Sequence, residues 1–225
     1  LLRRHFSLKE CQTSTVPISG WKSFITIHFF NHAAVILISL INGYFLTASE
    51  FSVLTAANRF TLLISFCLIA FNFVAAPKYA KLYQQQAHEE LRRFAQSVTK
   101  IVVLIVVPIA CILWVMANDV MSLYGKEFRP YGYILSILLF GQVVNAATGS
   151  VVYLLTLSGH EKDMKMVSVW IQPSTVIISL ILTYFMGLIG VAISLALSSI
   201  ALNLSAYYYV VKRLGFHTFK LGINK

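Results

Sequence analysis

The chain has 225 residues, of which 58% are hydrophobic and only 12% are charged, with a formal net charge of +10 and a mean hydropathy of +0.75. Soluble domains are about 45–50% apolar and about 25% charged, and a soluble fold of this length could not bury so much apolar surface. The composition therefore excludes an ordinary soluble domain. The chain opens LLRRHF, without Met and without the order of regions found in a signal peptide, so we expect a fragment that lacks something N-terminal.

Six apolar segments follow one another along the chain. A transmembrane helix needs about 20 mostly apolar residues, and each span must satisfy its own backbone polar groups, which makes these segments helices. The predicted spans are residues 24–46, 53–76, 101–117, 133–157, 167–186 and 188–211. We therefore predict an all-α integral membrane protein, with a bundle of about six transmembrane helices at 23–211 between an N-terminal tail or linker (1–22) and a C-terminal tail (212–225).

Basic residues collect on one side of the predicted membrane. Of the 18 Lys and Arg residues, 15 precede the first span, lie between spans two and three or four and five, or follow the sixth. Only Lys126 and Arg129 lie on the other side. The positive-inside rule then predicts a multi-pass protein with both termini cytoplasmic. The positive charge also favours anionic membrane lipids as partners, whereas nothing indicates a nucleic-acid partner.

The segment between the second and third spans has an amphipathic pattern. Leu91, Phe94, Ala95 and Val98 recur at helical spacing, opposite Arg92 and neighbouring polar residues. This pattern predicts a short interfacial helix lying on the cytoplasmic leaflet.

Catalytic and cofactor-binding motifs are missing from the sequence. It contains no Gly-rich phosphate loop, no HExxH and no GxSxG, and its acidic residues form no obvious buried pair. His28 and His32 have no carboxylate or cysteine nearby to complete a metal site, and the three cysteines are scattered. We therefore expect a transporter and not an enzyme, with no metal and no cofactor.

Polar residues mark the first two spans, and one of them is charged. Arg59 lies in an apolar stretch, TAANRFTLLISFCLIAFNFVAAP, where a charge costs at least about 2.5–3.5 kcal/mol and usually marks a pathway. A short turn near 47–52 should make the two spans antiparallel neighbours, so that their polar stripes form one wall of a hydrated cavity. The predicted cavity residues are Arg59, His28, Asn31, His32, Asn42, Asn58 and Asn72.

Simpler interpretations of these residues remain open. The asparagine amides can form interhelical hydrogen bonds, and Arg59 can extend outward to the membrane surface. The histidines can be neutral and packed or titrate near pH 7. The remaining spans are predicted to be scaffold, because small residues at four-residue spacing allow close helix packing. These residues are Gly190, Ser194 and Ser198 in the sixth span and Gly141, Asn145 and Gly149 in the fourth.

Two segments resemble a known family. APKYAKLYQQQAHEELRRFAQSVTK (76–100) resembles the linker after span eight of polysaccharide flippases in the MATE/MOP superfamily, and DVMSLYGKEFRPYGYILSILLFGQVVNAATGSVVYLLTLSGHEKDM (119–164) resembles the region that follows. The resemblance covers about residues 20–215. It implies a transporter of two related halves, of which this chain is the C-terminal half.

The resemblance also implies a function. Such proteins translocate an undecaprenyl-pyrophosphate-linked oligosaccharide, such as an O-antigen or capsule unit of lipopolysaccharide or capsule biosynthesis, across the bacterial inner membrane by alternating access. Arg59 would attract the pyrophosphate or an acidic sugar, and the histidines and asparagines would bond sugar hydroxyls or hold water. Expected partners are the lipid-linked oligosaccharide, membrane lipids, the N-terminal half and glycan assembly proteins. The alternatives are a cation-coupled drug or small-molecule exporter of the same superfamily, a membrane-embedded glycan polymerase or acyltransferase, and a structural subunit.

Overall fold

A computed structural model describes residues 18–218, and in this part of the chain every regular element is a helix, without a strand. The helices are α1 (Ile18–Phe45), α2 (Ala48–Gln84), α3 (His88–Val115), α4 (Ala117–Ser122), the 3-10 helix η1 (Lys126–Tyr131), α5 (Gly132–Thr148), α6 (Val151–Leu157) and α7 (Glu161–Leu214). Five helical stretches in this part are long and apolar enough to cross a membrane. The predicted all-α membrane fold is confirmed.

The longest helix, α7, folds back on itself. Its 54 residues would extend about 81 Å if straight, far more than the roughly 30 Å of bilayer hydrocarbon. Gly187 interrupts it with φ 55° and ψ −132°, and Gly190 then passes directly against the backbone of Leu182. We call residues 161–186 the first arm and residues 188–214 the second arm. The six predicted spans correspond to α1, α2, α3, α5 with α6, and these two arms.

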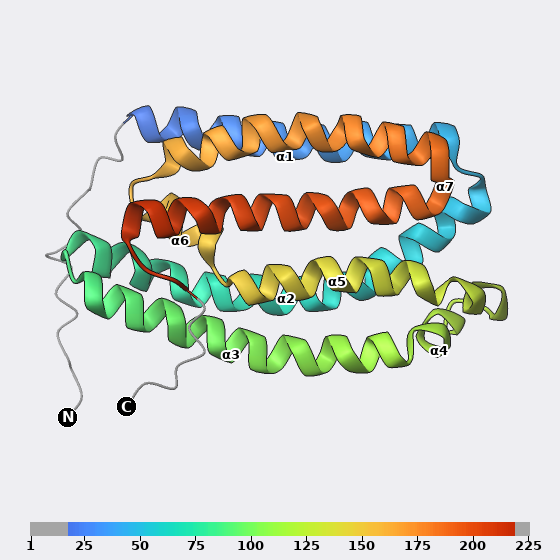
Figure 1. Ribbon diagram of the computed structural model, residues 1–225, viewed down its shortest axis with the longest axis horizontal. Helices are drawn as coiled ribbons and strands as arrows, with labels where there is room; N and C mark the ends of the chain where they lie inside the picture. The colour runs from blue at the N-terminus through green and yellow to red at the C-terminus, as the bar shows by residue number, and fades with distance from the viewer. Residues whose placement is uncertain (1–17, 219–225) are drawn as a thin grey trace, which may run out of the picture.

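The helices stack as layers (Figure 1). The first arm of α7 lies beside α1, the second arm lies in the middle, and α5 and α2 follow, with α3 on the far side. One end of the bundle carries the start of α1, the α2–α3 turn and the end of α7, and we call it the basic end. The α1–α2 turn, α4 and the reversal between the two arms of α7 lie at the other end, which we call the loop end.

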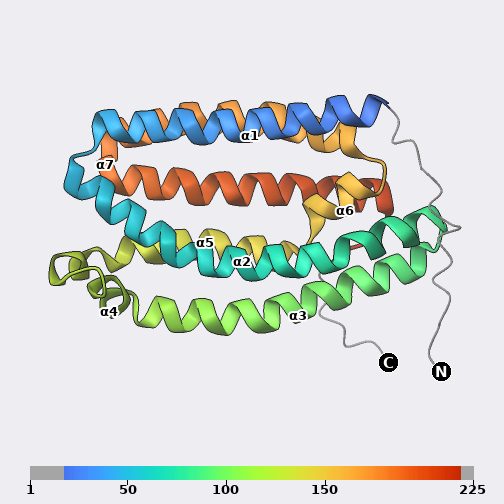
Figure 2. The ribbon, with the colours of Figure 1, turned by 180° about the vertical axis from the view of Figure 1, so that it is seen from behind.

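The first two spans are not packed against each other, which corrects the sequence prediction. They diverge from their connecting turn, and the second arm of α7 lies between them (Figure 2). The turn itself is well defined, because the Thr47 hydroxyl accepts from the Glu50 backbone and the Glu50 carboxylate accepts from the Thr47 backbone. This reciprocal cap starts α2 firmly. The fold therefore separates the two predicted polar stripes.

The predicted interfacial helix is also wrong. α2 continues through Pro77 to Gln84, and residues 88–99 are the first turns of α3, which run straight into the membrane span. Leu91 and Ala95 are buried, and Phe94 packs edge-on against Tyr79 of α2, with ring centroids 5.3 Å apart. The apolar stripe therefore packs on a neighbouring helix instead of on lipid.

Close packing joins α5 to the second arm of α7. An added Cβ on Gly141 would lie only 3.1 Å from the Cα of Ala196, which confirms the predicted role of small residues here. At the basic end, Arg213 holds Asp163 with two hydrogen bonds, of 2.7 Å from Nε and 2.9 Å from Nη2. Asp163 is buried. This bidentate pair ties the beginning of the first arm to the end of the second.

Candidate functional site

The two asparagines predicted on α1 face α7. The Gln172 amide on the first arm donates a 2.7 Å hydrogen bond to the Asn31 side chain. Asn42 is buried, and its side-chain oxygen has no hydrogen-bond partner within the described residues. Both side chains therefore lie on the packed side of α1, although the sequence placed them in one stripe with the histidines.

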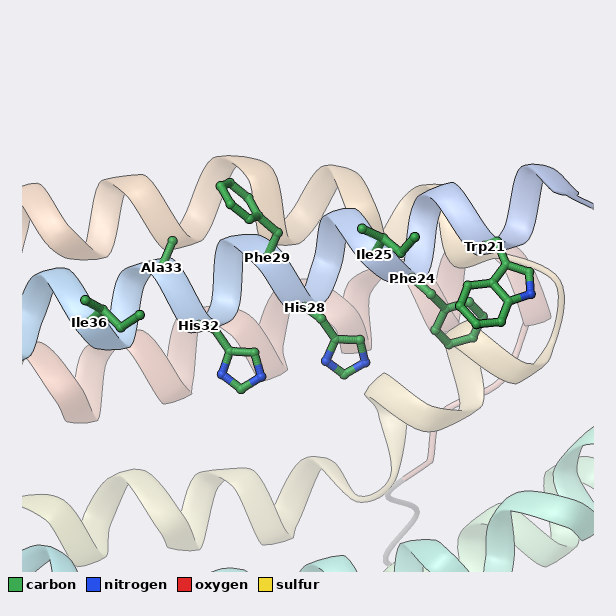
Figure 3. A pocket seen from close by; sticks show the side chains of 8 residues that line it. All are labelled: Trp21, Phe24, Ile25, His28, Phe29, His32, Ala33 and Ile36. Carbon is green, nitrogen blue, oxygen red and sulfur yellow. The ribbon is translucent and has the colours of Figure 1, made fainter.

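His28 and His32 lie on the open side of α1. Their rings stack with centroids 6.2 Å apart, and both side chains are exposed. They line a shallow hollow of about 830 Å³ along α1, together with apolar residues that include Trp21 and Phe29. Figure 3 shows both imidazoles pointing from α1 toward the side on which α6 lies. The imidazole rings of His28 and His32 are therefore exposed on this side of the bundle.

The polar residues of α2 lie on two faces, not on one. Arg59 and Asn72 are 13 residues apart, which places them about 140° apart around a helix of 3.6 residues per turn. Asn58 is half-buried and lies on the same side of α2 as Ser65 and Asn72 by the same geometry. The prediction of a single polar stripe is therefore wrong, because it joined residues of similar character without following the helical period closely enough.

Arg59 faces a hollow at the loop end of the bundle. Its side chain is exposed, and it has no ion pair within residues 18–218. The hollow, of about 510 Å³, is also lined by Ser52 and Thr55 of α2 and by Tyr124 and Phe128 from the loop between α4 and α5. A free guanidinium among hydroxyls and aromatic rings can bind an anion from the membrane surface.

A third cavity, which we call the deep cavity, lies where α2, α5, α6 and the second arm of α7 meet. It measures about 270 Å³. Its polar lining residues come from all four elements and are Ser65, Asn72, Asn145, Ser150, Tyr153 and Asn203. The side chain of Ser65 also reaches Gln142 of α5, with 3.3 Å between the two oxygens. Among the cavity residues predicted from the sequence, only Asn72 lines this cavity; Asn145 and Gly149, which also line it, were predicted to be scaffold.

A break in the fourth span shapes this cavity. Gly149 separates α5 from α6 with φ 75° and ψ −157°, a region that is essentially restricted to glycine. Its missing side chain leaves room for Thr99 of α3, whose hydroxyl would collide with an added Cβ. The Thr218 hydroxyl, beyond the end of α7, donates a 2.8 Å hydrogen bond to the Thr148 carbonyl. Contacts from α3 and from the segment that follows α7 therefore stabilise the break.

The first arm of α7 carries a buried polar seam that was not predicted from the sequence. Ser168, Gln172, Thr175, Ser179 and Thr183 are all buried. Ser194 of the second arm donates a 3.1 Å hydrogen bond to Ser179. The five residues of the first arm follow one another at intervals of three or four residues, a helical spacing that could have been found, but the small hydroxyl residues do not stand out in an apolar span.

Among the described residues, no three His, Cys, Asp or Glu side chains gather into a group that could hold a metal ion. The polar lining of the deep cavity consists of amides and hydroxyls, without a charged side chain. The arrangement suits hydrogen bonding to a neutral polar group, whereas Arg59 is the one cationic residue that lines the hollow at the loop end.

The fold and these cavities define a multi-pass, all-helical membrane protein with polar pockets inside an apolar bundle. A family model described as polysaccharide biosynthesis protein matches residues 3–132, which is more than half of the chain, and the chain belongs to that family. The resemblance to polysaccharide flippases found in the sequence agrees with this match. No individually curated protein matches the chain.

Proposed function

We propose that the protein translocates an undecaprenyl-pyrophosphate-linked oligosaccharide across the bacterial inner membrane by alternating access, without catalysis and without a cofactor. One observation carries the proposal: a polysaccharide-biosynthesis membrane protein has an amide-lined cavity at a helix break within its bundle. Non-helical backbone at membrane depth is tolerated where it is buried or lines a water-filled cavity. Broken helices near the membrane midplane are also typical of transporter binding sites.

Arg59 is the proposed contact for the charged part of this cargo. A guanidinium can bind two oxygens of a pyrophosphate or a carboxylate at once. The 13 residues from Arg59 to Asn72 correspond to about 20 Å along the helix axis, so the anion contact and the deep cavity lie at different heights. In this proposal His28, His32 and Asn58 bond sugar hydroxyls or hold water.

The basic end faces the cytoplasm in this proposal, because it carries most of the Lys and Arg residues of the described chain. The proposed partners are membrane lipids, glycan assembly proteins and a second helical bundle, N-terminal in the same protein. The second bundle would cover the open sides of α1 and α2, and rocking of the two bundles against each other would expose the cargo to either side.

The test uses a cell that lacks its own translocator for lipid-linked oligosaccharide. The protein that contains both the proposed N-terminal bundle and this chain, which we call the two-bundle protein, should restore surface polysaccharide. This chain alone should not. Arg59→Ala should abolish restoration at an unchanged membrane level, and Arg59→Lys should restore only part of it, since an ammonium keeps the charge but loses the planar fork. Arg129→Ala is the matched control, because Arg129 is also exposed at the loop end, where it pairs with Asp119 at 3.1 Å.

Two results would count against this function. Normal restoration by a well-expressed Arg59→Ala protein would remove Arg59 from the mechanism, and equal losses for Arg59→Ala and Arg129→Ala would indicate a general effect of charge. If the two-bundle protein is present in the membrane but never restores polysaccharide, translocation of this cargo is wrong.

A further inference from the structure

The deep cavity beside the helix break is built for hydrogen bonding. Asn72 makes no hydrogen bond within the described residues, and neither does the hydroxyl of Tyr153. Asn203 donates one amide hydrogen to the Ser199 carbonyl at 2.9 Å, which leaves its side-chain oxygen and second hydrogen free. An amide can donate two hydrogen bonds and accept two. Several donors and acceptors from different helices are therefore available at one point.

The helix break at Gly149 adds non-helical backbone to the lining of this cavity. A continuous helix through Gly149 would pair its backbone N–H and C=O groups with one another. Here the helix is interrupted instead, and contacts from Thr99 and Thr218 stabilise the interruption. Gly149 and Ser150 themselves line the cavity. Non-helical backbone at membrane depth is tolerated either where it is buried in protein or where it lines a water-filled cavity. Because this backbone lines an accessible cavity, we expect the cavity to contain water or a polar ligand.

We propose that this cavity is a binding subsite for one neutral sugar ring of the transported oligosaccharide. The proposal deepens the function proposed above and rests on it. Sugar hydroxyls both donate and accept hydrogen bonds, as do the amides and hydroxyls of Asn72, Asn203 and Tyr153. The cavity of about 270 Å³ lies just below the usual range of about 300–1,000 Å³ for small-molecule sites, which suits one ring and not a longer oligosaccharide.

The lining also predicts discrimination by charge. No cationic side chain lines the cavity, so a sugar with a carboxylate would lose water there without gaining an ionic partner. Acidic sugars should therefore be excluded from this subsite, while an anionic group of the cargo is directed to Arg59, about 20 Å away along α2.

The test measures sugar binding directly, without a lipid carrier. Purified protein in micelles is titrated with the methyl glycosides of glucose, galactose, mannose and N-acetylglucosamine, and with methyl glucuronide, using saturation-transfer difference NMR. At least one neutral glycoside should bind, and the glucuronide should bind about tenfold more weakly or not at all. Asn72→Leu and Asn203→Leu should each weaken binding of the neutral glycoside by about tenfold, since each leaves a sugar hydroxyl unpaired.

Two further variants control for folding. Tyr153→Phe removes one hydroxyl and keeps the ring, so it should weaken binding by about three- to tenfold in a folded protein. Asn118→Leu makes the same chemical change as the test variants at an exposed site outside the cavity, and it should leave binding unchanged.

Several results would overturn the subsite. These are no binding by any neutral glycoside, equal binding of the glucuronide, or folded Asn72→Leu and Tyr153→Phe proteins that bind like the wild type. The cell assay separates this failure from failure of the function. Restored surface polysaccharide with unaffected glycoside binding in the variants would reject the subsite alone. Glycoside binding that depends on Asn72 and Asn203, without any restoration, would reject the transport function and keep the sugar site.

Discussion

Replacement of Gly149 by alanine should destabilise the protein through two separate effects. A φ of 75° is strained for a residue with a side chain, at a cost of about 1–3 kcal/mol. The new methyl group would also collide with the Thr99 hydroxyl and lie 3.0 Å from the Thr99 Cβ and Cγ2, and such overpacking costs about 1–3 kcal/mol more. We therefore expect a total loss of about 2–6 kcal/mol in the free energy of unfolding.

A double-mutant cycle separates the two effects. Thr99→Ala removes two of the three colliding atoms, at the cost of one buried hydrogen bond from Thr99 to the Ala95 carbonyl, 2.9 Å long and worth about 1 kcal/mol. The double variant should then be about 1–2 kcal/mol more stable than the sum of the single effects predicts. The strain of the positive φ should remain.

The assay is reversible unfolding of the protein in mixed micelles, followed by circular dichroism. Gly43→Ala is the matched control, because it lies within α1 and an added Cβ there meets no atom within 4 Å. Alanine should be neutral or slightly stabilising at that position. If Gly149→Ala is as stable as Gly43→Ala, or if the cycle shows no coupling with Thr99, the described break in the fourth span is wrong.

Two further predictions concern the clamp at the basic end and the orientation of the chain. Arg213→Met should lower the free energy of unfolding, because it leaves the buried Asp163 carboxylate without its partner. Adding Asp163→Asn should recover part of the loss, and unchanged unfolding of the single variant would contradict this prediction. In a background without the three native cysteines, a cysteine at Gly125 should react with an impermeant thiol reagent from outside sealed cells, whereas one at His88 should not. Labelling of the His88 position from outside would reverse the proposed orientation.

The spans could be predicted from the sequence because a bilayer imposes a simple rule. About 20 apolar residues and internal backbone hydrogen bonds determine a transmembrane helix without reference to its neighbours. The reversal between the fifth and sixth spans lies at Gly187, between the two predicted segments. Membership of the polysaccharide biosynthesis family followed from local sequence in the same way, and the family match confirms it.

The relative placement of the helices could not be predicted in this way. The sequence placed α1 beside α2 because a short turn joins them, but the second arm of α7 lies between them. Elements that follow one another in the sequence are often, but not always, adjacent in space. Leu91 and Ala95 showed the correct amphipathic period for α3, yet a period does not indicate whether the apolar face meets lipid or another helix.

The deep cavity was missed for a related reason. Asn145 and Gly149 were assigned to a helical packing stripe, since glycine in a membrane span usually serves close packing. The break at Gly149 depends on Thr99 and Thr218, which are distant in the sequence. Asn203 and Tyr153 reach the same cavity from two further elements, and no local pattern connects them.

The most direct test of the proposed translocation is transport by purified protein. The two-bundle protein is reconstituted into liposomes that contain a fluorescent undecaprenyl-pyrophosphate-linked oligosaccharide, and movement between leaflets is followed by a membrane-impermeant reagent that modifies the outer-leaflet sugar. We predict that the protected inner-leaflet fraction becomes accessible with the wild type and Arg129→Ala, and stays protected with Arg59→Ala and in protein-free liposomes. Equal accessibility with the wild type and with Arg59→Ala, or no transport by correctly folded wild-type protein, would contradict this prediction.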